Sequence, residues 1–104
     1  NALAGVPMEL IDTHGAVSAQ VAEAMVGGVI ARSNASAGLA ITGVAGPDGG
    51  SVQKPVGTVF IAWQAPEHGV RSERFQFHGD RDAIRRQSVA AALAELISLA
   101  AHPV

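Results

Sequence analysis

Residues 42–50 read Thr-Gly-Val-Ala-Gly-Pro-Asp-Gly-Gly, and residues 54–58 read Lys-Pro-Val-Gly-Thr. They lie between two apolar runs, at residues 39–41 and 59–63. Glycine permits positive φ angles and lets backbone N–H groups approach a ligand, because it has no Cβ in the way. Since α/β proteins usually bind their ligands on loops at the ends of buried strands, this stretch predicts a ligand-binding loop.

The same stretch has a second interpretation, as a long hairpin connection with no ligand of its own. Two common phosphate-binding motifs are absent from the sequence. The P-loop pattern G-x-x-x-x-G-K-[ST] does not occur, and neither does the dinucleotide fingerprint G-x-G-x-x-G. Composition alone therefore leaves both interpretations of the loop open.

The overall composition indicates one small folded domain. The chain has 104 residues, of which 48% are hydrophobic but only 4% aromatic, so the core must be built from Ala, Val, Leu and Ile. A formal net charge of −2 gives no electrostatic basis for binding nucleic acid or a membrane surface. The lack of cysteine excludes disulfides and thiolate metal sites. With no signal-like start and no long apolar run, we expect a cytoplasmic protein.

Apolar periodicity and turn residues predict the element order α-α-β-β-β-α, with helices packed on a sheet. A short helix around residues 8–12 is expected to be closed by Gly15. Ser18 is the expected N-cap of a second helix over residues 19–35, because its hydroxyl can accept a free first-turn N–H.

Three strands and a last helix are expected to follow. Residues 39–42 are continuously apolar, which predicts a strand buried on both faces, and residues 56–63 are β-branched and aromatic. Residues 70–77 alternate, which predicts an exposed edge strand antiparallel to its predecessor. Asp80 is the expected N-cap of a helix over residues 81–101. The apolar stripe of that helix comprises Ile84, Val89, Ala92, Leu93, Leu96, Ile97 and Ala100.

Three blocks of the sequence carry a family signature. The first is G-V-P-M-E-L-I-D-T-H-G-A-V-S at residues 5–18. The second is I-T-G-V-A-G-P-D-G-G at residues 41–50, with K-P-V-G-T-V-F-I-A at residues 54–62. The third is F-H-G-D-R at residues 77–81. In this order and spacing they cover nearly the whole chain and resemble the CinA C-terminal domain family, whose members include competence- and damage-associated proteins.

This resemblance implies a fold and an activity. The fold is of class α/β: a three-layer α/β/α sandwich with a mixed β-sheet, in a single CinA C-terminal-like domain over residues 1–104 whose first part is missing. The activity is that of a bacterial nicotinamide mononucleotide deamidase of the pyridine nucleotide salvage cycle. Such an amidohydrolase converts the carboxamide to a carboxylate and releases ammonia, and no cofactor or metal is implied.

Amide hydrolysis needs an activated nucleophile, a base and donors for the oxyanion. The resemblance implies a serine in a T-A-E-S-C-T-G-G-type motif and a lysine in a Y-S-N-x-x-K-type motif. Neither motif is present, and counting back from Gly5 places the lysine immediately before Asn1. No catalytic residue is therefore assigned in this sequence.

The resemblance assigns the holding of the nucleotide substrate to Thr42, Gly43, Ala45, Gly46, Gly49, Gly50, Lys54 and Arg81. The Thr42 hydroxyl would bond the nucleotide, or would merely cap a strand end. The glycines would offer N–H groups to phosphate or carboxamide oxygens, or would serve turn geometry alone. Lys54, the only lysine, would meet a phosphate as a point charge, or would be a solvated loop residue.

Arg81 is the most distinctive of these residues. Its guanidinium suits bidentate recognition of phosphate or carboxylate. An arginine at a helix N-terminus opposes the helix macrodipole, so electrostatics alone would not choose it there. This mismatch favours a functional role for Arg81.

The remaining charged residues are expected to be structural or solvated. Asp80 reads as a cap and Asp48 as a turn residue. The histidines lack metal-ligand spacing, and the one nearest the proposed site is His78. The other histidines are His14, His68 and His102. Solvated surface charges are expected at Arg71, Arg74, Arg85 and Arg86.

Two functions of different classes follow. One is the amidohydrolase, acting on a small-molecule nucleotide substrate. The other is a non-catalytic nucleotide-binding or interaction module, favoured by the missing serine and lysine motifs. A homodimer is a further expectation, because Gly27-Gly28 and the alanine-rich last helix would allow close helix contacts.

Overall fold

The computed structural model describes residues 2–3, 6–44, 46, 49–66 and 68–101. Its elements follow the expected order, preceded by a short strand pair that the sequence did not predict. They are β1 (Ala2–Leu3), β2 (Val6–Pro7), α1 (Met8–His14), α2 (Ala19–Ser33), β3 (Gly38–Gly43), β4 (Thr58–Ala65), β5 (Gly69–Gln76) and α3 (Arg81–Ala101).

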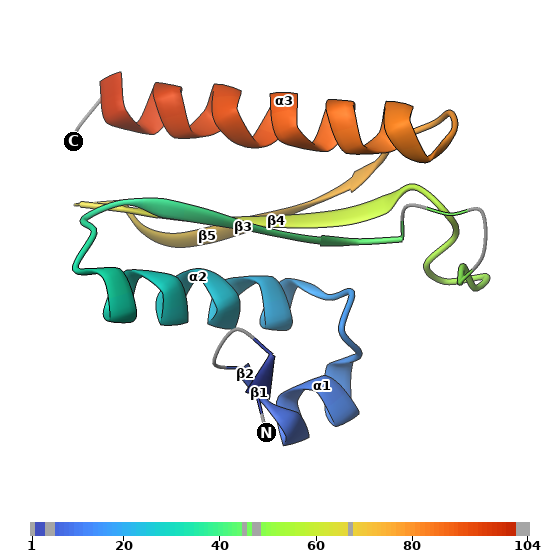
Figure 1. The fold of residues 1–104 in the computed structure, drawn as a ribbon, viewed down its shortest axis with the longest axis horizontal. Helices are drawn as coiled ribbons and strands as arrows, with labels where there is room; N and C mark the ends of the chain where they lie inside the picture. Colours follow the sequence, from blue (N-terminus) through green and yellow to red (C-terminus); the bar gives the residue numbers. More distant parts are fainter. Residues whose placement is uncertain (1, 4–5, 45, 47–48, 67, 102–104) are drawn as a thin grey trace.

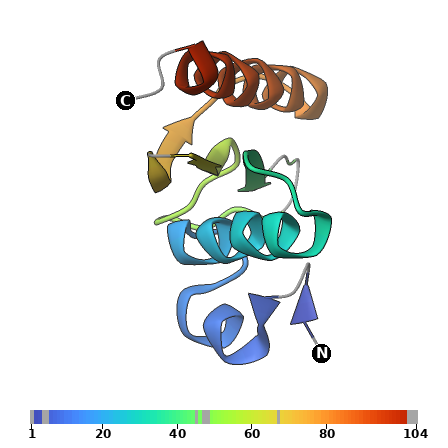
Figure 2. The same cartoon turned by 90° about the vertical axis from the view of Figure 1, so that its left-hand side faces the viewer.

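The elements form three layers, which confirms the expected α/β/α sandwich (Figure 1). The sheet of β3, β4 and β5 lies in the middle, with α3 on one face and α2 on the other. The view along the helices shows α1 and the β1–β2 pair on the outer side of α2 (Figure 2). One core therefore forms on each face of the sheet.

The sheet has the strand order β3-β4-β5, and both of its strand pairs are antiparallel. The mixed sheet expected from the resemblance is thus not seen within the described residues, because a hairpin connection joins each strand to the next. The expectation that residues 39–42 are buried on both faces is wrong as well. Strand β3 lies at an edge of this sheet and buries only Ala40, whereas the central strand β4 is buried along nearly its whole length.

The two cores use alternate residues of β4, because successive side chains of a strand point to opposite faces. The core under α3 contains Val59, Ile61, Trp63, Ala65, Ile84, Ala92 and Leu99. The core under α2 contains Ala22, Val26, Ala40, Phe60 and Ala62. Trp63 also donates its indole N–H to the carbonyl of Ala92 at 2.9 Å, which fixes α3 on the sheet.

The predicted helix caps are confirmed. The Ser18 hydroxyl accepts a hydrogen bond from Val21 N at 3.2 Å, and the Asp80 carboxylate accepts one from Ala83 N at 2.8 Å. Gly15 closes α1 with a φ of 81°. Each cap satisfies a backbone group that the helix itself cannot pair.

The apolar stripe predicted for α3 separates into two rows. Its inner row is buried at Ile84 and Ala92 and half-buried at Leu96, and it continues to the buried Leu99, which was not predicted, whereas the predicted Ala100 is exposed. Its outer row is exposed: Val89 by 50%, Leu93 by 49% and Ile97 by 67%. The outer residues are four positions apart, so they line one side of the helix that the sheet does not reach. The prediction of a single core-facing stripe was therefore too broad.

Candidate functional site

The glycine-rich loop, residues 44–57, joins the adjacent antiparallel strands β3 and β4. It is folded on its own backbone, since Val44 N donates to Thr58 O at 2.9 Å and Gly57 N donates to Val44 O at 2.6 Å. Within the loop, Ser51 N donates to Lys54 O at 3.0 Å. The hairpin interpretation of this stretch thus describes its topology.

Close packing accounts for several glycines of the loop and for Gly43 at the adjoining end of β3. A Cβ on Gly46, whose φ is 84°, would lie 2.7 Å from Val56 Cγ1. A Cβ on Gly50 would lie 2.7 Å from Val56 N, and one on Gly43 would lie 2.8 Å from Val59 Cγ2. Gly49 is exposed with a φ of 100°. The candidate residue Ala45 lies outside the described residues, as does Asp48.

Thr42 and Lys54 bind the segment that connects α1 to α2. The Thr42 hydroxyl donates to Ala16 O at 2.8 Å, and the Lys54 ammonium donates to His14 O at 3.1 Å. Both side chains hold the connecting segment against the loop and the end of β3. In this arrangement their hydrogen bonds join segments of the protein to one another.

Arg74 is a further part of this assembly that sequence reasoning missed. Its Nη2 donates to Gln53 O at 2.7 Å, so β5 holds the glycine-rich loop. The guanidinium lies 5.6 Å from the centroid of the Phe60 ring, and the Lys54 ammonium lies 5.8 Å from the same centroid. Both distances are within the range of cation–π attraction. Arg74 is therefore not simply a solvated surface charge.

Arg71 is also paired, with Glu95 Oε2 of α3 at 3.1 Å. The next residue of β5, Ser72, donates to the carboxylate of Glu23 on α2. Because Arg71 is half exposed, this ion pair adds little to stability.

A pocket of about 300 Å³ lies on the opposite face of the sheet, between the end of β3 and the start of α3. We call it the α3 pocket. Its lining residues are Ile41, Gly43, Val59, Arg81, Ile84, Arg85, Ser88 and Val89. The pocket lies where β3 ends, at Ile41 and Gly43, next to the first turns of α3.

The sheet separates the candidate site residues into two groups. Gly43 and Arg81 line the α3 pocket together. Thr42 points to the other face of β3, where it contacts the α1–α2 connection, as does Lys54. The structure thus brings Thr42 near Lys54, and Gly43 near Arg81, but it does not gather the four residues in one cavity.

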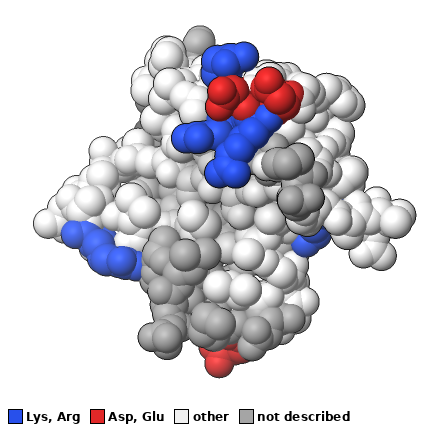
Figure 3. Space-filling model, turned by 45° about the vertical axis from the view of Figure 1, so that its right-hand side comes forward, with Lys and Arg blue, Asp and Glu red and all other residues white. Residues whose placement is uncertain are grey.

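The α3 pocket is lined by cations without a carboxylate. Arg81 and Arg85 are one helical turn apart, and no acidic residue belongs to its described lining. A wider groove of about 550 Å³ runs over the outer side of α3 and contains Asp82, Arg85, Arg86, Val89 and Ala90. Charged side chains gather at this end of the molecule (Figure 3).

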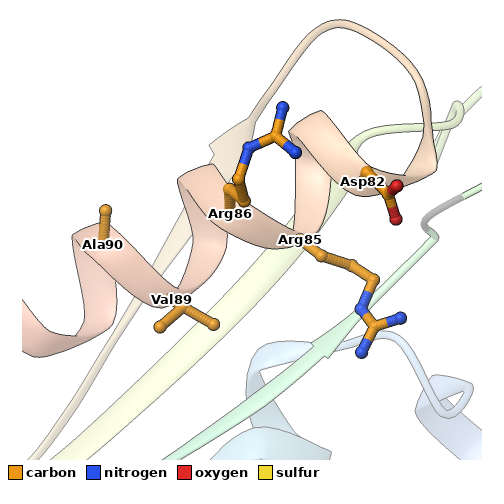
Figure 4. A pocket seen from close by; sticks show the side chains of 5 residues that line it. All are labelled: Asp82, Arg85, Arg86, Val89 and Ala90. Atoms are coloured by element: carbon orange, nitrogen blue, oxygen red, sulfur yellow. The ribbon is translucent and has the colours of Figure 1, made fainter.

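Figure 4 shows how the two neighbouring arginines differ. Arg85 extends toward the end of β3, whereas Arg86 projects from the helix in the opposite sense. Sequence reasoning treated both as solvated charges. The spacing of Arg81 and Arg85, which puts them on one helical face, was the signal that could have separated them.

His78, the histidine expected nearest the site, does not line the α3 pocket; its carbonyl accepts a hydrogen bond from Gln87 Nε2 at 2.8 Å. Across the described part of the chain, no group of three His, Asp or Glu residues is placed to hold a metal ion. Among the described helices, none combines the length and apolar character needed to cross a membrane.

These features define an α/β/α domain with a ligand-sized pocket at one end of its sheet. The model of the CinA C-terminal domain matches residues 1–100, and the chain belongs to this family. It is 57% identical over 95 residues to the nicotinamide-nucleotide amidohydrolase PncC of Pseudomonas putida, covering 91% of this chain and 59% of that protein. It is 50% identical over 91 residues to a CinA-like protein of Geotalea daltonii, covering 88% of this chain but 22% of the relative.

Solved structures agree with the fold. The crystal structure of the competence/damage-inducible protein CihA from Agrobacterium tumefaciens superposes with a TM-score of 0.86 at 43% identity, over 91% of this chain and 58% of that chain. A CinA superfamily protein from Escherichia coli gives a TM-score of 0.83 at 35% identity, over 89% and 54% of the two chains. The chain thus spans between half and three-fifths of these two solved structures.

Proposed function

We propose that this chain holds the substrate in an amidohydrolase that converts nicotinamide mononucleotide to nicotinic acid mononucleotide and ammonia, within pyridine nucleotide salvage. The observation that carries the proposal is the α3 pocket, with Arg81 at a strand end in a chain 57% identical to a protein named nicotinamide-nucleotide amidohydrolase. Its volume of about 300 Å³ is at the lower end of the range of small-molecule sites.

In this proposal the charged and apolar parts of the pocket bind different parts of the nucleotide. The Arg81 guanidinium binds phosphate oxygens through charge-assisted hydrogen bonds. The apolar walls formed by Ile41, Val59 and Ile84 pack against the pyridine and ribose. Thr42 and Lys54 contribute by fixing the loop and the α1–α2 connection around the strand end.

The hydrolytic step needs groups that the described site does not assign. The family resemblance gives the roles of nucleophile and base to a serine and a lysine in motifs that this sequence lacks. The nucleophile would attack the carboxamide carbon, the base would pass the nucleophile's proton to the nitrogen so that ammonia leaves as the C–N bond breaks, and water would then hydrolyse the acyl-enzyme to the carboxylate. Donors to the oxyanion would stabilise the tetrahedral intermediate. The proposal requires neither a metal nor a cofactor.

The second candidate function is a nucleotide-binding module without catalysis. The observation that favours it is the described lining of the α3 pocket, which offers two cations and apolar walls to a ligand. Both candidates predict binding in the α3 pocket, so a binding measurement does not distinguish them. Hydrolysis of the nucleotide does, because only the amidohydrolase would release ammonia.

The experiment is ammonia release from nicotinamide mononucleotide by the purified chain, together with binding of the same nucleotide measured by calorimetry. Turnover supports the amidohydrolase. Binding without turnover supports the binding module, and the absence of both contradicts the two proposals together. The expected homodimer and cytoplasmic location stay predictions, which size-exclusion chromatography and cell fractionation would test.

A further inference from the structure

We infer that Arg85 acts with Arg81 as a two-arginine clamp for the phosphate monoester of the ligand. This inference deepens the proposed function and rests on it, since it names a second phosphate-binding residue in the same pocket. The sequence alone predicts only a solvated surface charge at Arg85.

The first argument is geometric. Arg81 and Arg85 are separated by four positions in α3, which puts them on the same side of the helix one turn apart. Both line the α3 pocket with Gly43 and Ile41 of β3. Figure 4 shows that the Arg85 side chain extends toward this strand end, whereas Arg86 does not, and Arg86 is absent from the lining.

The second argument is electrostatic. Two like charges at positions i and i+4 of a helix repel each other by about 0.2–0.5 kcal/mol. Within the described residues, neither the Arg81 nor the Arg85 side chain forms an ion pair or hydrogen bond, and no carboxylate lines their pocket. The carboxylate of Asp82 lies in the outer groove, which Arg85 also lines, but among the described residues it forms no ion pair with Arg85 or Arg81. The uncompensated charge therefore faces the pocket, where a doubly charged anion would offset it.

The third argument comes from the pocket walls. Its other described side chains are apolar, except for Ser88, whose hydroxyl already donates to Ile84 O at 2.7 Å. The two guanidiniums are thus the described side chains available to a polar ligand group there. Both side chains are exposed, so their attraction for an anion comes from paired, charge-assisted hydrogen bonds rather than from burial. A phosphate monoester, with three terminal oxygens and nearly two negative charges, is the ligand group that fits both forks.

The test compares three probes and four forms of the full chain. The probes are nicotinamide mononucleotide, nicotinamide riboside (the same molecule without phosphate) and inorganic phosphate. The forms are wild type, Arg85→Ala, Arg85→Lys and the matched control Arg86→Ala, each checked for an unchanged melting temperature. Calorimetry gives the dissociation constants.

We expect Arg85→Ala to weaken mononucleotide binding about 10-fold or more, because a hydrogen-bonded charge pair is lost. Arg85→Lys should lose less affinity, since lysine keeps the positive charge but not the paired N–H donors of the guanidinium. Arg86→Ala should change binding by less than about two-fold, as expected for an exposed charge outside the pocket. The affinity for the riboside should be the same in all four forms.

Equal losses in Arg85→Ala and Arg86→Ala would overturn the clamp, as would a riboside that loses as much affinity as the mononucleotide. Wild-type chain that binds the two ligands equally would also overturn it, while leaving the proposed function to the turnover assay. Phosphate binding that depends on Arg85, without binding of either pyridine ligand, would support the clamp and contradict the proposed function. Failure to bind any probe would contradict both.

Discussion

The two faces of the sheet use their polar residues differently. On the α2 face, Thr42, Lys54 and Arg74 each donate to a backbone carbonyl, and together they hold the glycine-rich loop and the α1–α2 connection in place. On the α3 face, Arg81 and Arg85 line a pocket and have no side-chain partner among the described residues. The polar side chains named on the first face have protein partners, whereas the two arginines of the second face are available to a ligand.

This difference separates stability from binding. A polar group with a protein partner lowers the free energy of the folded state, and its removal is measured as lost stability. A charged group that is placed without a protein partner, against helix electrostatics, is better explained by a ligand. The predictions below test whether the two faces can be separated in this way.

The largest effect is expected at the base of the glycine-rich loop. Gly57 has a φ of 95°, and a Cβ there would lie 2.1 Å from Phe77 O, a backbone atom that cannot move aside cheaply. We expect Gly57→Ala to lose about 3 kcal/mol or more of unfolding free energy, measured by urea denaturation.

The matched control is Gly69→Ala. Gly69 also has a positive φ, 68°, but a Cβ there meets nothing within 4 Å. It should cost only about 1–2 kcal/mol, from backbone conformation alone. Equal losses for the two variants would mean that close packing is not what requires glycine at residue 57.

The next effect concerns how α3 is attached. Leu99 is 6% exposed under the helix, and Leu93 is 49% exposed on its outer side. Leu99→Ala should destabilise the fold by about 2–3 kcal/mol, because it leaves a cavity. Leu93→Ala should cost about 0.5 kcal/mol or less, as at most surface positions. A reversed order in thermal denaturation would show that the outer row of α3 is buried in solution.

Arg81→Ala should affect binding and not stability. Removing one charged donor from the pocket is expected to weaken nicotinamide mononucleotide binding by about 10- to 100-fold. The melting temperature should stay the same, since Arg81 is exposed and lacks a protein partner in the described residues. Unchanged affinity in calorimetry would remove Arg81 from the site.

Thr42→Val should produce the smallest effect. In contrast to Arg81→Ala, it should lower stability and leave binding nearly unchanged. Loss of the hydrogen bond to Ala16 O should cost about 1 kcal/mol of unfolding free energy. Binding should change by less than about three-fold, because Thr42 lies on the other face from the α3 pocket. A large binding loss with unchanged stability would place the Thr42 hydroxyl on the ligand.

The parts of the fold that depend on local chemistry could be predicted from sequence. Ser18 and Asp80 were identified as caps because a side-chain oxygen before an apolar helix has few other roles. The strand positions followed from runs of β-branched and aromatic residues. Strand β5 was correctly predicted as antiparallel and exposed because its polar and apolar residues alternate.

The parts of the fold that depend on tertiary packing could not be predicted from sequence. Continuous apolar sequence in β3 looked fully buried, yet edge and central strands differ in their neighbours rather than in their own residues. Likewise, helical spacing put Val89, Leu93 and Ile97 in one stripe with the core residues of α3, and only the sheet decides which row it covers. Arg74 was missed because its contacts, Gln53 and Phe60, are distant in sequence, and the position of Arg85 beside the end of β3 likewise depends on the packing of α3.

The most direct test is to titrate nicotinamide mononucleotide into the ¹⁵N-labelled chain and follow the backbone amide resonances. The account predicts shifts that cluster at the α3 pocket, at Ile41, Gly43, Val59, Arg81 and Arg85, with much smaller shifts at Ala16 and Lys54. Shifts confined to the α1–α2 connection and the Lys54 side of the loop would contradict it, because the ligand would then lie on the face that the protein already satisfies.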